Sequence, residues 1–574
     1  MLINLEVNNR QIQAQSGETI LSALNRNGIR VPTICSMESF SPTGACRMCV
    51  VEAEGHEHLI TACSYPVEEG MKLRTHSPRV LKARKTNVEL LLSNHPDDCL
   101  YCERNGNCEL QHLAEDLNVR ERRIPGHKSQ YKVDKSSPAI FHDPAKCILC
   151  GRCIRVCEET TGISAIDFTY RGSNLQVMAA MAKPLNFSSC ISCGQCVMAC
   201  PTGALTEKVQ FHELDGSLHD PDKVVVLQYT TAVAVSIAEE FHLKPGSDLK
   251  GLINAALRKC GFAYIFETAF GADVAIMEQA ALFADGVERD GKFPVFTSSC
   301  PAWVRYVEQF RPDLLSYLSP VRSPQQITGS LIRRWFSEKA GIPADRIYSV
   351  AVTSCTAAKS EAQRVEMTWK GIQDIDSVLT TRELARLIRL NGIDLNHLEP
   401  EPADAPLIAG DSAGKLFYVA GGEAEATIRT IHRQITGDEL PVIRLNKFRG
   451  ARILKETSIL TGKKVVQMAA VSGLANAIRL IEEIQAGKRH YDFVEVMACP
   501  DGCINGGGQP LPSDENQVRV RMKTIYDIDN KAAIKVAHKS PTINRLYEEF
   551  LEKPGSGKAR NMLHTVYSEK EILK

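Results

Sequence analysis

The sequence has no excess of charge of either sign, because Lys and Arg together number 68 and Asp and Glu also number 68. This balance gives no reason to expect nucleic acid or an acidic membrane surface as a partner. No apolar run reaches the roughly 18 residues that a membrane span needs, and residues 1–15 lack the basic and then apolar layout of a signal peptide. We therefore expect a soluble, cytoplasmic protein that acts on small molecules or on other proteins.

Cysteine, in contrast, is abundant, with 20 residues in a chain of 574. A chain of this length exceeds one hydrophobic core, so three or four domains are expected. Thiols in the cytoplasm stay reduced, and these fall in tight groups rather than in scattered pairs, which favours metal ligation over disulfides. Cys260 alone falls in no group, and we expect it to be a buried, inert thiol.

Residues 1–80 predict a β-grasp domain that holds a [2Fe–2S] cluster. Apolar residues alternate on both sides of Asn8 and Asn9, which is typical of a β-hairpin, and the stretch 16–28 predicts a short helix that Gly28 ends. Four cysteines follow, at Cys35, Cys46, Cys49 and Cys63. Their layout resembles that of a plant-type ferredoxin with a longer first spacing, and a structural zinc site is the alternative.

Residues 81–125 predict a small domain with a [4Fe–4S] cluster. The spacing there is His95-x3-Cys99-x2-Cys102-x5-Cys108. A lone histidine is more often a surface or core residue than a ligand, but this one completes a set that otherwise has three members. Imidazole in place of a thiolate removes one negative charge from the cluster, which should raise its reduction potential.

Residues 126–209 contain an internal repeat that predicts a two-cluster ferredoxin domain. Two C-x2-C-x2-C-x3-C runs begin 43 residues apart, and in such runs the fourth cysteine binds the other cluster. The expected ligand sets are therefore Cys147, Cys150, Cys153 and Cys200 for one [4Fe–4S], and Cys157, Cys190, Cys193 and Cys196 for the other. The first 210 residues thus predict an electron relay of four clusters, which must end at a catalytic or exchange site.

Residues 210–574 predict an α/β domain, so that the whole chain is a multi-domain α+β protein. Apolar runs at 223–228, 262–267, 293–298, 416–422, 464–473 and 493–499 alternate with helical stretches such as 323–336 and 380–390, which favours a parallel sheet with flanking helices. The last four cysteines, Cys300, Cys355, Cys499 and Cys503, stand at or just after the ends of such runs. Since ligands gather at the carboxyl ends of parallel strands, we expect these thiols to converge on one more cluster, with the glycines at 506–508 allowing a close approach of the backbone.

Three segments carry a resemblance to the [FeFe]-hydrogenases of the large clostridial type, and the resemblance covers essentially the whole chain. They are TSSCPAW (297–303), SCTAAK (354–359) and EVMACPDGCINGGGQP (495–510). The resemblance implies an H-cluster, in which Cys300, Cys355, Cys499 and Cys503 hold a [4Fe–4S] cubane and Cys503 also bridges to a diiron unit with CO, cyanide and a dithiolate bearing an amine. It further implies that Met497, Gln325, Ser323 and Phe417 line the pocket and that the glycine run leaves room beside the diiron unit.

The implied reaction is 2H⁺ + 2e⁻ ⇌ H₂, with a ferredoxin or flavodoxin-type protein as electron partner and with maturation proteins that supply the diiron unit. The cofactor carries the iron chemistry, and the protein supplies ligation, a dry pocket, an electron path and a proton path.

The proton path is where the sequence departs from this family. Ser299 stands where the family has a cysteine, Gln279 and Leu282 stand where it has two relay glutamates, and Gly286 replaces an arginine, so that only Ser319 remains. A serine hydroxyl is too weak an acid to titrate near neutral pH, and an amide does not titrate. We therefore expect slow turnover limited by proton delivery, unless another route has replaced the usual one.

The diiron pocket also departs from the family. Thr230 and Thr231 replace an Ala-Pro pair, Thr353 replaces a methionine, and Ala358 replaces a lysine that contacts a cyanide. These changes bear on rate and catalytic bias and leave the cluster ligands untouched.

Three other functions share parts of this pattern. The large iron–sulfur subunit of NADH dehydrogenase shares the layout of the first 210 residues but should lack the four C-terminal cysteines. An iron–sulfur assembly factor should lack the N-terminal relay. A slow H₂-sensing or regulatory homologue normally adds a signalling domain, whereas the tail here is typical of the catalytic family. We predict a ferredoxin-linked hydrogenase with altered kinetics, and the sensing role is the second interpretation.

Overall fold

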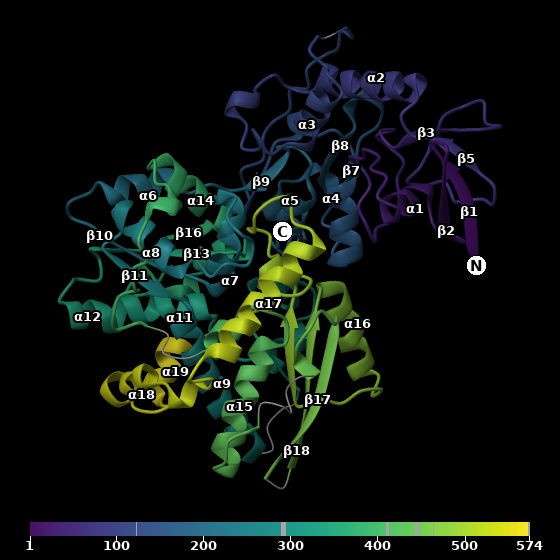
Figure 1. The fold of residues 1–574 in the computed structure, drawn as a ribbon. Helices are drawn as coiled ribbons and strands as arrows, with labels where there is room; N and C mark the ends of the chain where they lie inside the picture. Colours follow the sequence, from purple (N-terminus) through teal and green to yellow (C-terminus); the bar gives the residue numbers. More distant parts are fainter. Residues whose placement is uncertain (122, 289–293, 409–411, 442–446, 463, 572–574) are drawn as a thin grey trace.

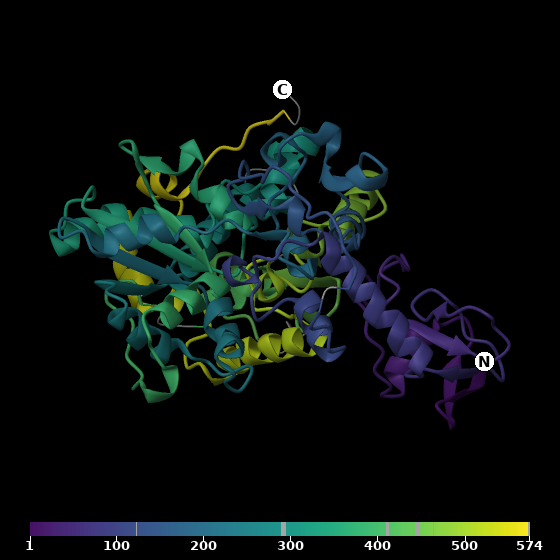
Figure 2. The ribbon, with the colours of Figure 1, turned by 90° about the horizontal axis from the view of Figure 1, so that it is seen from above.

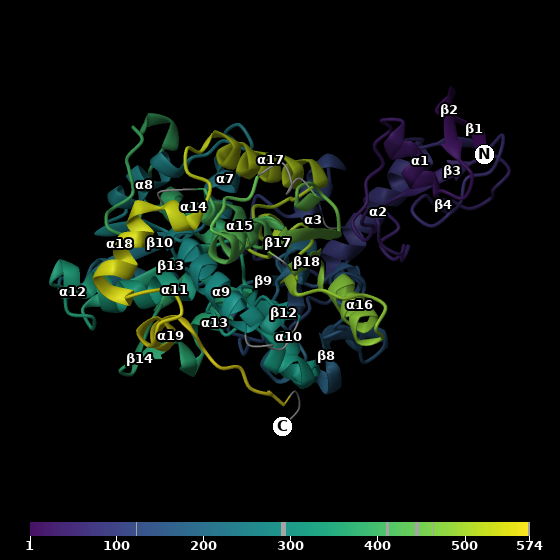
Figure 3. The same ribbon diagram turned by 90° about the horizontal axis from the view of Figure 1, so that it is seen from below.

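The computed structural model describes residues 1–574 except 122, 289–293, 409–411, 442–446, 463 and 572–574. The N-terminal domain, purple in Figure 1, lies to one side of the rest of the molecule, and Figure 2 and Figure 3 show the same separation from above and below. Helix α2 (Pro78–Asn94) leads from this domain toward the cluster-binding middle of the chain.

The N-terminal domain is a five-stranded sheet with helix α1 (Ile20–Arg26), in the strand order β2-β1-β5-β3-β4. The predicted hairpin is confirmed, since Asn8 and Asn9 form the turn with φ of 49° and 65°. Gly28, with φ of 72°, follows the end of α1 as predicted. The strands are β1 (Leu2–Val7), β2 (Arg10–Gln15), β3 (Val50–Ala53), β4 (Ile60–Thr61) and β5 (Lys72–Arg74).

The middle of the chain contains short elements around the cysteine runs. The repeat seen in the sequence is visible in the backbone, because Gly151 and Gly194 adopt left-handed φ of 72° and 71° just before helices α4 and α5. The elements are α3 (Glu109–Asp116), β6 (Ile140–His142), α4 (Arg152–Arg155), β7 (Ile166–Thr169), β8 (Gln176–Ala179), α5 (Gln195–Ala199) and β9 (Leu205–Glu207).

Two four-stranded sheets form the large C-terminal domain. The first is parallel throughout and has the order β11-β10-β13-β16, and the second has the order β12-β19-β18-β17. Their strands are β10 (Val224–Tyr229), β11 (Tyr264–Glu267), β13 (Ile347–Thr353), β16 (Ser377–Thr380), β12 (Val295–Phe296), β17 (Leu454–Thr461), β18 (Lys464–Ser472) and β19 (Phe493–Met497).

Five of the six predicted apolar runs contain strands, although residue 293 lies outside the described residues. The run 416–422 is not a strand, and the prediction there was wrong. It overlaps a 3₁₀ turn (Gly414–Tyr418) that packs between two helices, and a Cβ on Gly422 would lie 1.8 Å from the carbonyl oxygen of Leu416. A short apolar run signals burial, and burial alone does not separate a strand from a buried turn.

Helices cover both sheets, and the two predicted helical stretches are confirmed. Residues 324–331 form α11, which continues as a π turn (Ile332–Phe336), and α14 begins at Thr381 behind a capping box of Thr380 and Glu383. The helices used below are α6 (Phe211–Leu218), α7 (Thr231–Ser236), α9 (Ala269–Glu288), α10 (Pro301–Phe310), α11 (Pro324–Leu331), α14 (Thr381–Leu390), α15 (Gly422–Thr436) and α17 (Glu515–Lys531). Among the described residues no helix is long and apolar enough to cross a membrane.

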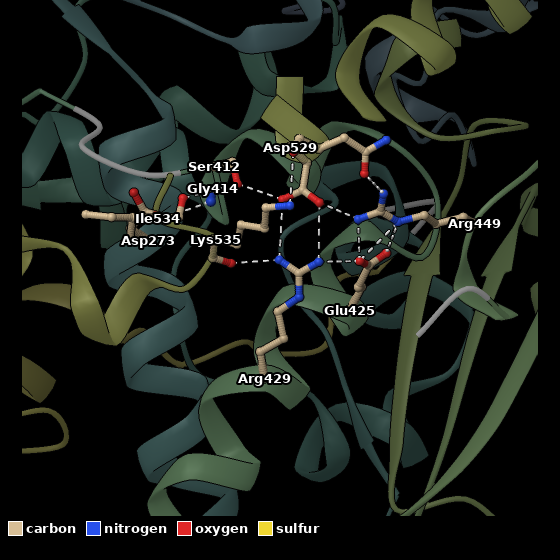
Figure 4. Close-up of polar contacts among 10 residues, drawn as sticks. Asp273, Ser412, Gly414, Glu425, Arg429, Arg449, Asp529, Ile534 and Lys535 are labelled. Atoms are coloured by element: carbon tan, nitrogen blue, oxygen red, sulfur yellow. Dashed lines mark hydrogen bonds and ion pairs between the residues drawn. The ribbon is translucent and has the colours of Figure 1, made fainter. Parts of the chain in front are cut away.

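A buried ion network fixes helix α15 to helix α17 (Figure 4). Arg429 of α15 pairs with Glu425 of the same helix and with Asp529 of α17. Arg449 closes the network, with its Nη2 atom 2.7 Å from Glu425 Oε1 and paired also with Asp529. Ser412 Oγ donates to Asp529 at 2.6 Å. Since the side chains of Glu425, Arg429 and Asp529 are 1% exposed, the network holds α15 in one orientation.

Candidate active site

The four C-terminal cysteines line one cavity between the two sheets of the large domain. Cys355 follows β13 of the first sheet, Cys499 follows β19 of the second sheet, and Cys300 is the N-cap of α10. Cys503 completes the set from the next turn of the same loop as Cys499. The carboxyl ends of parallel strands thus bring three distant loops together. The predicted convergence therefore occurs, with the loops drawn from two sheets instead of one.

Most of the predicted pocket residues line this same cavity. The lining includes Thr230, Ser299, Ser323, Gln325, Thr353, Ala358, Phe417 and Met497. Gln279, Thr231, Leu282, Gly286 and Ser319 are not part of this lining. Ser319 is buried and its hydroxyl accepts from the backbone N–H of Val321 at 3.3 Å.

Several polar atoms at the cavity have no hydrogen-bond partner within the described parts of the chain. They are Thr230 Oγ1, Gln325 Oε1 and Tyr418 OH, and all are buried. Buried polar atoms are normally satisfied, so these three point to a bound group that carries polar ligands of its own. Together with four thiols, which are soft ligands, this donor set fits an iron–sulfur centre with a further polar unit.

Glu361 also lines the cavity, and the sequence had not singled it out. It accepts from Ser323 Oγ at 2.8 Å, and its burial raises its pKa to about 7. Gln325 Nε2 donates to the carbonyl oxygen of Ala358 at 3.4 Å. Glu361 also lines a neighbouring polar cavity that contains Arg305, so this carboxyl stands between two cavities.

The glycines at 506–508 pack against protein atoms, and Gly506 also lines the cavity. A Cβ would lie 2.3 Å from the Ser354 carbonyl oxygen at Gly506, 2.5 Å from the Cys193 carbonyl oxygen at Gly507, and 2.8 Å from Thr380 Cβ at Gly508. Real Cβ atoms do not approach this closely. The run therefore lets the active-site loop pack against the ferredoxin-like domain and against the first sheet.

The side chain of Ser299 is hydrogen-bonded to Glu423, a titratable residue that the sequence analysis did not identify. Ser299 Oγ donates to Glu423 Oε2, and Gln279 Nε2 donates to Glu423 Oε1 at 2.7 Å. Burial, with the nearby charge of Glu495, raises the pKa of Glu423 to about 8, although the two hydrogen bonds oppose the shift. Gln279 and Leu282 supply no titratable group, but Glu423 does. Glu423 does not stand out in the sequence, because acidic residues are favoured in the first turn of any helix by the helix dipole.

The first cysteine group comes together as expected. The thiol of Cys35 lies within hydrogen-bonding reach of Cys46 and Cys63, and Cys49 lies within reach of Cys63. These thiols are buried or half-buried on loops beside the N-terminal sheet. A set of four thiols on loops suits an iron–sulfur cluster.

His95 is arranged as a ligand would be. Its Nδ1 atom is buried and has no hydrogen-bond partner among the residues that the structure describes. Burial, together with Lys128 and Lys146, lowers its pKa to about 4, so the imidazole is neutral at pH 7, which is the form that binds metal. In the same group, the thiol of Cys102 interacts electrostatically with Cys99, and the thiol of Cys108 interacts electrostatically with Cys102.

The two ferredoxin-like sets are crossed in space. Cys200 influences the thiols of the first run, Cys147, Cys150 and Cys153, whereas Cys157 of the first run groups with Cys190, Cys193 and Cys196. Burial raises the pKa of both Cys147 and Cys150 to about 12, so these thiols need a metal to become thiolates. Cys260, which is in no group, is buried with its pKa raised to about 11.

The second of these sets touches the active-site cavity directly. Cys193 lines the cavity, and Gln195 of α5 donates to Cys499 Sγ at 3.3 Å and to the Asn505 carbonyl oxygen at 3.1 Å. Thr356, next to Cys355, donates to the Ser192 carbonyl oxygen at 2.8 Å. Sequence spacing identified the cysteines but had no means of showing that Gln195 reaches across to a ligand 304 residues away.

Five known families match successive parts of the chain. Two hydrogenase families cover most of the C-terminal part, which are "Iron only hydrogenase large subunit, C-terminal domain" (223–507) and "Iron hydrogenase small subunit" (515–570). The other matches are "2Fe-2S iron-sulfur cluster binding domain" (1–78), "NADH-ubiquinone oxidoreductase-G iron-sulfur binding region" (84–123) and "NADH-quinone oxidoreductase subunit 3, ferredoxin-like domain" (137–206). The NADH dehydrogenase likeness is thus limited to the N-terminal part.

Individual proteins give the same result. The chain is 38% identical to the NADP-reducing hydrogenase subunit HndD of Solidesulfovibrio fructosivorans over 100% of both chains, and 35% identical to iron hydrogenase 1 of Clostridium pasteurianum over 98% of this chain and 99% of that one. A solved structure of a variant of the [FeFe]-hydrogenase HydA1 from Chlamydomonas reinhardtii covers 62% of this chain and 98% of its own, with 33% identity and a TM-score of 0.56. The chain therefore belongs to the [FeFe]-hydrogenases of the clostridial type and is a hydrogenase with accessory iron–sulfur domains.

Proposed function

We propose that this hydrogenase exchanges electrons with a ferredoxin or flavodoxin-type protein in the cytoplasm, through one [2Fe–2S] and three accessory [4Fe–4S] clusters that lead to an H-cluster. The domains that carry these groups are 1–80, 81–125, 126–209 and 210–574. The observation that carries the proposal is the contact between Cys193 and the cavity of Cys300, Cys355, Cys499 and Cys503. It gives electrons a direct way from the accessory clusters to the catalytic centre.

The ligands of each cluster follow from the groups described above. Cys35, Cys46, Cys49 and Cys63 hold the [2Fe–2S] cluster, and His95, Cys99, Cys102 and Cys108 hold the first [4Fe–4S] cluster. Cys99 is exposed, as are the neighbouring Leu100 and Tyr101, so a cluster bound there would lie close to the surface. Electron exchange with a protein partner needs at least one cluster near the surface.

In the active site, Cys300, Cys355, Cys499 and Cys503 would hold the H-cluster, with Cys503 as the ligand on the side of the diiron unit, which maturation proteins would insert. When bound, the H-cluster supplies the iron chemistry that interconverts H₂ with two protons and two electrons. Met497 and Phe417 keep the cavity apolar, and Ser323, Gln325 and Glu361 form its polar side. Thr353 and Ala358 set the catalytic bias, because they replace larger residues beside the diiron position.

Infrared spectroscopy of the matured, anaerobically purified full chain tests this function. We expect bands of iron-bound CO and cyanide, iron and sulfide in the amounts that five clusters require, and H₂ evolution with reduced ferredoxin. Cubanes without CO and cyanide bands after complete maturation would contradict the hydrogenase site. Bands together with activity from an artificial dye, but with none from any ferredoxin or flavodoxin, would contradict only the proposed partner.

A further inference from the structure

We propose that Glu423 is the proton-carrying residue behind Ser299, and that the pair Ser299–Glu423 is the route by which protons reach and leave the active-site cavity of this chain. The inference rests on the hydrogenase function and concerns how its protons move. Glu423 acts through Ser299, since Ser299 lines the cavity and Glu423 does not.

The first support is the order of the atoms. Ser299 is half-buried and lines the cavity, and its hydroxyl bonds directly to Glu423 Oε2, which belongs to the second residue of α15. Glu423 is 0% exposed. A serine between a cavity and a carboxyl can accept a proton from one side while it donates its own to the other, so it need not ionise.

The second support is the orientation of Gln279. Thr427 Oγ1 donates to Gln279 Oε1 at 3.3 Å, so the amide nitrogen of Gln279 faces Glu423 Oε1. Oε1 is therefore occupied as an acceptor, and a proton on Glu423 belongs on Oε2, the oxygen that faces Ser299. A glutamine at 279 thus complements a glutamate at 423 by hydrogen bonding. The family has its titratable group on the equivalent of helix α9, whereas this chain has it on helix α15.

The third support is the charge around the carboxyl. Glu495 of β19 accepts from the backbone N–H groups of Gly421 and Ala424, both at 2.7 Å, and these bonds favour its ionised form. Lys455 of β17 adds an opposing charge near Glu495, and the thiols of Cys300 and Cys503 are the other titratable groups that Glu423 influences. Since two adjacent buried carboxyls seldom both ionise, the proton of the pair resides on Glu423.

The transfer balances without any additional reactant. Neutral Glu423 gives the proton on Oε2 to Ser299 Oγ, while the hydroxyl proton of Ser299 moves to an acceptor in the cavity. Ser299 ends with one proton as before, and Glu423 ends as a carboxylate that is reprotonated before the next transfer by a proton that originates in the solvent. During H₂ oxidation the same steps run in reverse.

The test uses the matured full chain and the variants Glu423→Gln and Ser299→Ala. Glu423→Gln keeps the shape and hydrogen bonding of the side chain but removes its titration. General acid–base groups contribute roughly 10²–10⁴-fold, so we expect H₂ evolution to fall about 100-fold or more, with unchanged CO and cyanide bands. We expect Ser299→Ala to show a similar loss. The matched control is Glu278→Gln, which alters another fully buried carboxyl, bonded to Tyr547 and His564 away from the cavity, and should retain activity within a few-fold.

A second measurement is independent of turnover. In the protein before insertion of the diiron unit, infrared difference spectra between acid and alkaline pH should show the carbonyl stretch of a buried, protonated carboxyl that disappears with a midpoint near pH 8. This band should be absent from Glu423→Gln and present in Glu278→Gln.

Parental turnover in Glu423→Gln with a loaded H-cluster would overturn the proposal, as would persistence in Glu423→Gln of the carboxyl band whose midpoint lies near pH 8. If Glu423→Gln fails to load the H-cluster, two results still test the proposal. They are the carboxyl band of Glu423→Gln without the diiron unit and the turnover of Ser299→Ala. Absence of CO and cyanide bands from the parent protein would instead contradict the hydrogenase site itself.

Discussion

At the scale of single residues, the active site shows how one substitution depends on another. Ser299, Gln279 and Leu282 each remove a titratable group when each position is considered alone, and together they predict a blocked proton path. The structure places Glu423 against two of these residues, Ser299 and Gln279. The absence of a carboxyl at position 279 and its presence at position 423 therefore belong to one hydrogen-bonded arrangement. A single sequence does not show this, because positions 279 and 423 are joined only by the packing of α9 against α15.

This arrangement predicts that restoring a glutamate at 279 is harmful. Gln279→Glu removes the amide that donates to Glu423 Oε1 and brings a second carboxyl to the same distance, 2.7 Å in the parent. Like charges that close cannot both ionise, so one proton would be shared and held between the two carboxyls instead of passing to Ser299. We expect H₂ evolution per loaded H-cluster to fall at least roughly 10-fold, a size in line with loss of acid–base assistance.

The informative comparison is the double variant Gln279→Glu with Ser299→Cys, which recreates the family's residues at both positions. Faster H₂ evolution by this variant than by Ser299→Cys alone would show that protons follow the usual path of the family and that Glu423 is not needed.

Gly507 predicts an effect on the junction between domains. A Cβ at this position would lie 2.5 Å from the Cys193 carbonyl oxygen, so Gly507→Ala must push the ferredoxin-like domain away from the active-site loop. We expect weaker magnetic coupling between the neighbouring clusters in electron paramagnetic resonance, and slower turnover with a protein electron donor. Gly216→Ala is the control, because a Cβ at Gly216 in helix α6 meets no atom within 4 Å. Equal coupling in the two variants would show that the junction tolerates the extra atom.

At the scale of elements, the pattern of apolar residues predicts where many strands lie but not how the strands pair into sheets. The strands that carry Cys355 and Cys499 were predictable, because apolar runs of that length between helical stretches are typical of parallel sheets. The division into two sheets and the antiparallel strand β17 were not, since strand pairing is decided by contacts between distant segments. The run 416–422 failed for a related reason, because its apolar residues are buried in a turn between α9 and α15.

The ion network between α15 and α17 predicts a large effect on stability. Asp529→Asn leaves Arg429 and Arg449 buried with one partner fewer, and breaking such buried pairs costs about 3–5 kcal/mol. Although burial opposes it, the contacts with Arg429, Ser412 and Arg449 hold the pKa of Asp529 below its usual value. The network therefore contributes stability that is present at neutral pH and is lost as the pH falls through this lowered pKa.

Anaerobic thermal unfolding followed by circular dichroism checks this prediction. The midpoint for Asp529→Asn should lie well below that of the parent at pH 7, and the difference should narrow in acid. Glu515→Gln, which alters an exposed pair with Arg519 on the same helix, should change the midpoint little, because such pairs contribute roughly 0–1 kcal/mol. A pH-independent difference for Asp529→Asn would show that packing, and not charge, holds α15 in place.

At the scale of the whole molecule, the catalytic domain and the relay are separable in structure. The HydA1 structure matches 62% of this chain while using 98% of its own length, so a hydrogenase fold exists without most of the relay. In Figures 1 and 2 the N-terminal domain likewise stands apart from the two catalytic sheets. The sequence showed this organisation well, because cysteine spacing is local and needs no tertiary contact to be recognised. It did not show the contacts of Gln195 and Thr356 that join the relay to the catalytic loops.

This separation predicts the result of removing the relay. Deletion of residues 1–209 takes away the fifteen cysteines of the first four groups and His95, together with Gln195, but leaves Cys300, Cys355, Cys499 and Cys503 in the catalytic domain. We expect CO and cyanide bands close to those of the full chain, with small shifts because Cys499 loses its hydrogen bond from Gln195. Turnover with ferredoxin should disappear, while turnover with a small reducing dye, which reaches the cubane directly, should remain. A shorter deletion of residues 1–125 keeps the ferredoxin-like domain and Gln195, and it should show unshifted bands. Ferredoxin-linked activity that survives in the longer deletion would mean that the partner docks on the catalytic domain, and that the four N-terminal groups serve another purpose than carrying electrons to the H-cluster.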